Sequence, residues 1–163
     1  MNPAVLRAPE VTHDDSAHSY ELRAPATLTT PCVARHFVTG VLAASGHSAL
    51  ADDARICVSD AVTNAVQHAG VQTLRIELTA NTNGIVVAVC DDNVRRLPWP
   101  RQARDDEESG RGLTLVRGIA HSSGVSWIWD ELQLVGKRVW FELRDGQEEG
   151  ATRPGTARGW GGR

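Results

Sequence analysis

One stretch of the chain gathers polar side chains that could do chemistry. Residues 56–69 read as a helix that Gly70 ends. At 100° per residue, Asp60 and Asn64 share one face, and His68 lies at the edge of that face. A carboxylate beside an amide could combine an acid/base group with a metal ligand. A polar surface stripe explains the same residues, and the helix alone leaves both interpretations open.

A glycine pair precedes a second predicted helix. Gly110 and Gly112 flank Arg111, and an apolar segment of helical period follows from Leu113. Glycine lets a backbone approach a ligand closely, and the N–H groups and dipole at a helix start attract anions. The motif fits phosphate binding, although a simple loop-to-helix turn also accounts for it.

A carboxylate ends a continuous apolar run. Residues 85–90 are all apolar and read as a central strand, and Asp91 follows them directly. A carboxylate at a strand end can accept a hydrogen bond from an exocyclic amine, such as that of adenine. Ordinary turn chemistry, in which aspartate is common, is the alternative.

The other segments predict how these residues are positioned. Helices followed by antiparallel pairs indicate the α+β class, as a two-layer sandwich with a mixed, mainly antiparallel sheet and helices on one face. A helix should begin at Thr30, whose hydroxyl would cap it, followed by Pro31. Further strands are expected at 19–23, 74–78, 125–129 and 138–143, the last two joined through Gly136.

Composition and charge narrow the classes of protein. The 163 residues suffice for one domain with a core, and the formal net charge of −3 offers no basic surface for nucleic acid. No apolar run approaches the roughly 20 residues of a membrane span. Three cysteines far apart in sequence favour free thiols. We therefore expect a cytoplasmic protein without direct nucleic-acid or membrane contacts.

Composition also divides the chain into segments. Residues 1–17 are polar and predict a flexible N-terminus, residues 18–144 the domain, and residues 145–163 a flexible Gly/Arg-rich tail. Within the domain, residues 93–109 combine a basic half, an acidic half and two prolines that forbid a continuous helix. A loop of this length is typical of a lid or of a disordered segment.

Together these segments resemble the GHKL, or Bergerat-fold, ATP-binding family, which includes histidine kinases and gyrase. Residues 58–69 (VSDAVTNAVQHA) are similar to its N box, residues 110–116 (GRGLTLV) to its second glycine box, and residues 137–143 (KRVWFEL) to its closing strand. The likeness runs over about residues 20–143. It is closest to the small bacterial anti-sigma-factor serine kinases.

The resemblance implies a role for the polar helix and the strand end. Asn64 would hold Mg²⁺ beside the ATP phosphates, as suits a hard ion that keeps its waters. Asp60, where the family usually has glutamate, would be the general base toward a protein serine. Asp91 would receive the adenine amine. His68 follows the family pattern, with packing or a lid contact as its implied role.

The resemblance also implies how the phosphates are held. Gly110, Arg111, Gly112 and Leu113 would meet the phosphates, and residues 93–109 would form the lid over them. In the same family Asn93 stands where a glycine is common, and Arg138 where a threonine often supports the adenine pocket.

The expected function is that of an ATP-binding regulatory protein of the anti-sigma-factor serine/threonine kinase type. It would phosphorylate a serine of an antagonist protein, with a sigma factor as a second partner, and homodimers are common in the resembling group. The alternative is a non-catalytic ATP-sensing or degenerate module that acts by protein contact. Aspartate at position 60 is one methylene shorter than glutamate, about 1.5 Å less in reach. Enzymatic activity therefore stays open at this point.

Overall fold

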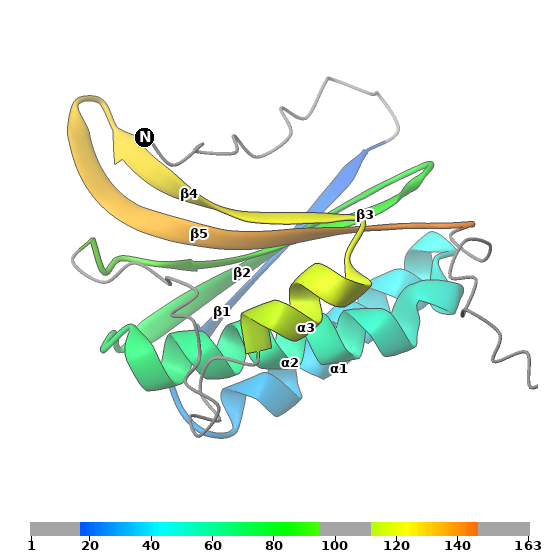
Figure 1. Cartoon of the computed structure of the whole chain (residues 1–163), viewed down its shortest axis with the longest axis horizontal. Helices are drawn as coiled ribbons and strands as arrows, with labels where there is room; N and C mark the ends of the chain where they lie inside the picture. Colours follow the sequence, from blue (N-terminus) through cyan, green and yellow to red (C-terminus); the bar gives the residue numbers. More distant parts are fainter. Residues whose placement is uncertain (1–16, 95–111, 147–163) are drawn as a thin grey trace, which may run out of the picture.

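The structure, a computed structural model, describes residues 17–94 and 112–146. These residues form one open sheet and three α-helices that lie against one of its faces (Figure 1). The elements in chain order are β1 (His18–Pro25), α1 (Thr30–Ser45), the short 3₁₀ helix η1 (Ser48–Leu50), α2 (Ala51–His68), β2 (Thr73–Asn81), β3 (Gly84–Asp91), α3 (Gly112–Ile119), β4 (Ser122–Asp130) and β5 (Gln133–Arg144).

The sheet has the strand order β1-β2-β3-β5-β4, so β3 lies at its centre. Every pairing among the described strands is antiparallel. The predicted α+β sandwich with helices on one face is therefore confirmed, while the parallel component of the predicted mixed sheet is absent from the strands described. In the helix layer, α2 lies between α1 and α3 and crosses β3 and β5 (Figure 1).

The core lies between the sheet and the helices because both layers turn an apolar face toward each other. Alternate residues of β2 are buried, as a half-buried strand requires, and β3 is buried almost throughout. Helix α2 supplies a stripe at helical spacing. The largest fully buried side chains are those of Val38, Leu42, Val58, Val62, Leu74, Ile76, Leu78, Ile85, Val87, Val89, Val116 and Phe141.

Two local expectations prove wrong in detail. Helix α1 begins at Thr30, but the Thr30 hydroxyl donates to the carbonyl of Pro25 and therefore does not cap the helix. Gly136 lies inside β5, because the chain turns earlier, at Glu131 and Leu132. Glu131 supplies the positive φ of 52° that the turn uses.

A long-range contact ties the layers together near the end of β5. His47 is buried where η1 begins, and its Nδ1 contacts the carboxylate of Asp145. The Asp145 N–H donates to the carbonyl of Asn83 in the β2–β3 turn, at 3.0 Å. These contacts hold the α1–α2 connection, the β2–β3 turn and the end of β5 together.

Gly136 allows β5 to pass close to the end of β3. A Cβ atom at this position would lie 2.5 Å from the backbone oxygen of Asp91, so an alanine must push the two strands apart. We expect Gly136→Ala to cost about 1–3 kcal/mol of stability, as overpacking does, seen as a fall in Tm of roughly 2–4 °C per kcal/mol. Gly118→Ala is the control, because nothing lies within 4 Å of its added Cβ. A Gly136→Ala protein as stable as wild type would contradict the close approach.

Candidate functional site

Helix α2 turns its two predicted chemical residues away from the core. Its buried stripe consists of Ala54, Cys57, Val58, Ala61 and Val62. Asp60 and Asn64 therefore fall on the other side of the helix, where both are half-buried. One helical turn separates them, so their side chains are neighbours.

The Asp60 carboxylate is incompletely satisfied. Its Oδ2 atom is buried, and it has no hydrogen-bond partner among the residues that the structure describes. Burial raises the pKa of this carboxyl. Unpaired buried polar atoms are uncommon in folded proteins and costly, so this one marks Asp60 as a candidate for chemistry.

Asp91 ends β3 on the side of the sheet that faces the helices. It follows Ile85, Val87 and Val89, whose side chains are in the core. The N–H of Asn93 donates to Asp91 Oδ1 at 2.9 Å, and the ammonium of Lys137 lies 3.4 Å from the same oxygen. Within the described part of the chain, both of these contacts use Oδ1, which leaves Oδ2 as an acceptor for a ligand.

Asp91 and Lys137 form a nearly dry ion pair. Their side chains are only 3% and 5% exposed, and the two residues face each other directly across β3 and β5. Burial raises the pKa of Asp91, and the Asn93 N–H and the Lys137 ammonium pull it back down. Sequence reasoning missed Lys137. The alternation of Val139, Phe141 and Leu143 into the core was the signal that could have placed it there.

Asn93 joins the strand end to the helix end. Its side-chain amide donates to the carbonyl of Ala69, the residue that follows α2. Asn64 precedes Ala69 by five residues, about 7–8 Å along the helix axis at 1.5 Å per residue. Asn93 thus fixes the acceptor at Asp91 relative to the amide at Asn64.

The structure describes some of the remaining predicted site residues. His68 is exposed and is the last residue of α2. Gly112 opens α3 and Leu113 follows it, and this helix packs beside α2 (Figure 1). Gly110, Arg111 and most of the predicted lid lie outside the described residues.

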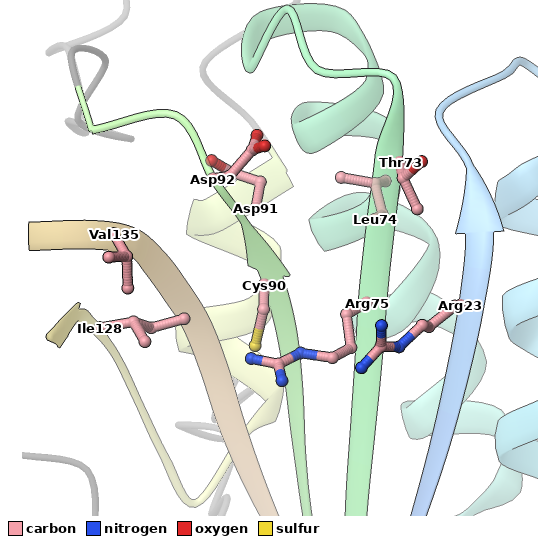
Figure 2. A pocket seen from close by; sticks show the side chains of 9 residues that line it. All are labelled: Arg23, Thr73, Leu74, Arg75, Cys90, Asp91, Asp92, Ile128 and Val135. Atoms are coloured by element: carbon pink, nitrogen blue, oxygen red, sulfur yellow. The ribbon is translucent and has the colours of Figure 1, made fainter. Parts of the chain in front are cut away.

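The opposite face of the sheet carries a different set of side chains. Arg138, which stands where the resemblance places a supporting threonine, points there and pairs with Glu77 at 3.3 Å. A hollow of about 240 Å³ opens on this outer face. Figure 2 shows Cys90, Arg75 and Arg23 in a row across it, from β3, β2 and β1. Asp60 and Asn64 are not among the residues that line this hollow, whereas Asp91, at the end of β3, does line it (Figure 2).

The fold and the site define an α+β domain with a strand-end acceptor beside a polar helix. Residues 24–134 match the model of the histidine kinase-like ATPase domain family. The match covers more than half of the chain, so the protein belongs to this family, which confirms the GHKL resemblance and makes it an ATP-binding regulatory protein of that type. No helix in the two described segments is long and apolar enough to cross a membrane.

The unsatisfied carboxylate of Asp60 should cost stability. Since burial raises its pKa, the ionised form destabilises the fold at pH values above that raised pKa, and the penalty disappears as the pH falls through it. Asp60→Asn removes the charge and should gain on the order of 1 kcal/mol. We expect a higher Tm than wild type at mildly alkaline pH and a smaller difference in acid. Equal Tm values at both pH values would show that the carboxylate is not penalised.

Proposed function

We propose that this protein is an ATP-dependent protein kinase of the anti-sigma-factor type, which phosphorylates a serine of an antagonist protein. The observation that carries the proposal is the pair of half-buried side chains on α2, in which Asp60 has a buried oxygen without a partner one turn from Asn64. The Asp60 carboxylate could serve as a general base, and the neighbouring Asn64 amide could serve as a metal ligand. Membership of an ATP-binding family supports the choice of phosphoryl donor.

The residues present fit the donor. Asp91 offers Oδ2 as an acceptor, while Oδ1 is held by Asn93 and Lys137, which suits an exocyclic amine. The side-chain oxygen of Asn64 suits Mg²⁺, which takes few protein ligands and keeps water and phosphate oxygens around it. Bound ATP would supply the phosphoryl group, and Mg²⁺ would neutralise the charge of the phosphates.

Asp60 would act on the protein substrate. The Asp60 carboxylate would accept the proton of the serine hydroxyl as the serine oxygen bonds to the γ-phosphorus, and the bond from that phosphorus to the β,γ-bridging oxygen would break to release ADP. A carboxyl whose pKa is raised by burial is a better proton acceptor than an exposed one.

A non-catalytic ATP-sensing module is the second candidate. The observation that favours it is the short aspartate on a half-buried stretch of helix, where the family usually carries the longer glutamate. In this case nucleotide binding would change how the protein contacts a partner, and no phosphoryl group would move. In both cases the proposed partners are a sigma factor and an antagonist protein. The proposed assembly is a homodimer.

The metal role of Asn64 predicts a specific loss. Asn64→Ala removes the oxygen ligand and leaves a good helix former. Titration calorimetry with ATP and Mg²⁺ should show affinity reduced at least about tenfold, which corresponds to roughly 1.4 kcal/mol. Gln67→Ala, an exposed change on the same helix, should bind as wild type does. Equal affinity of the Asn64 variant and wild type would remove Asn64 from the site.

The base role of Asp60 predicts a separation of binding from transfer. Asp60→Asn should abolish transfer of label from ATP to an antagonist serine and leave ATP affinity nearly unchanged. Asp60→Glu should keep or raise the transfer rate, because it restores the reach of the longer side chain. A wild-type protein that binds ATP and labels none of the candidate antagonists encoded near it would favour the sensing module.

A further inference from the structure

Lys137 is the single lysine of the chain, and it is buried. A lysine side chain is rarely buried unless it is paired. Here the ammonium lies 3.4 Å from Asp91 Oδ1 and donates to the carbonyl of Asn93 at 3.3 Å. It therefore contacts both residues that shape the strand end, and it lies beyond the residues matched to the family.

The ammonium decides which form of Asp91 is stable. A carboxylate as deeply buried as Asp91 is driven toward its neutral form unless a positive charge compensates it. Lys137 supplies that charge across the β3–β5 ladder. Asp92 is exposed and carries the opposite sign, so it does not replace the compensation.

The charge state of Asp91 in turn decides which purine it can bind. An ionised carboxylate only accepts hydrogen bonds, whereas a neutral carboxyl also donates one. A 6-amino purine such as adenine offers a donor at that position, and a 6-oxo purine such as hypoxanthine offers an acceptor. The ionised form pairs with the amine and opposes the oxo group, as two acceptors do.

We propose that Lys137 is a positioning residue that makes the site selective for 6-amino purines by holding Asp91 as an acceptor. The inference rests on the proposed nucleotide site, and it adds a reason why that site would prefer adenine to a 6-oxo purine. Lys137 acts through Asp91 and need not touch the base. The same arrangement gives a role to a lysine whose burial is costly.

The test compares ATP with ITP, which differ at the purine 6-position and carry the same phosphates. Calorimetry with Mg²⁺ should give a clear preference for ATP in the wild-type protein. Lys137→Met should lower the ratio of the ATP affinity to the ITP affinity by about tenfold. This is the discrimination expected from one charge-assisted hydrogen bond between the 6-amino group and Asp91. Lys137→Arg keeps the charge and should retain most of the preference.

Arg138→Met is the matched control, because Arg138 is the adjacent cation on β5 but pairs with Glu77 on the outer face. It should leave the ratio unchanged. On an Asp91→Asn background, Lys137→Met should change the ratio no further, since no carboxylate remains to be held. If Lys137→Met does not fold, Lys137→Gln replaces it, with the same expected loss.

The outcomes separate this inference from the proposed function. A wild-type protein that prefers ATP, with an unchanged ratio in the folded Lys137→Met or Lys137→Gln variant, overturns the role of Lys137 alone. Equal losses for both nucleotides would mean that Lys137 is only structural, and they overturn it too. A folded wild-type protein that binds neither nucleotide overturns the nucleotide site itself and this inference with it.

Discussion

A buried ion pair between β3 and β5 joins the fold of this protein to its chemistry. Asp91 and Lys137 face each other at the end of the central strand, almost entirely out of solvent. Such a pair is stable only with good geometry, because each charge loses its hydration and the attraction must compensate. The register of β3 against β5, the close passage at Gly136 and the link from Asn93 to α2 all serve that geometry. The strand end is therefore fixed before any ligand arrives.

Much of this architecture follows from periodicity in the sequence. The alternating segment of β2, the continuous apolar run of β3 and the striped helix α2 were each predicted at nearly their observed positions. Asp91 was placed at a strand end because the apolar run stops there. These features are local, and they follow directly from the helical period of 3.6 residues and the strand period of 2.0 residues.

The features that escaped prediction depend on contacts between distant segments. The residues around Lys137 in the sequence do not indicate that Asp91 is its partner. The register between β3 and β5 brings the two residues together. Gly136 was interpreted as a turn residue, since glycine is common in turns. The structure uses its missing side chain for close packing against the Asp91 backbone. Likewise, Asn93 was noted for the glycine it replaces, and its contact with Ala69 could not be read from the chain.

The strand order has a consequence for how the protein assembles. Among the described strands, only β2–β3 and β4–β5 are hairpins between neighbouring segments, while β1 pairs with β2 across two helices and β3 pairs with β5 across α3 and β4. Ladders between distant segments close large loops, which slows folding. The acceptor at Asp91 is complete only after the two hairpins have docked. A ligand that binds at Asp91 would stabilise the complete sheet and neither hairpin alone, so its binding would couple the two hairpins.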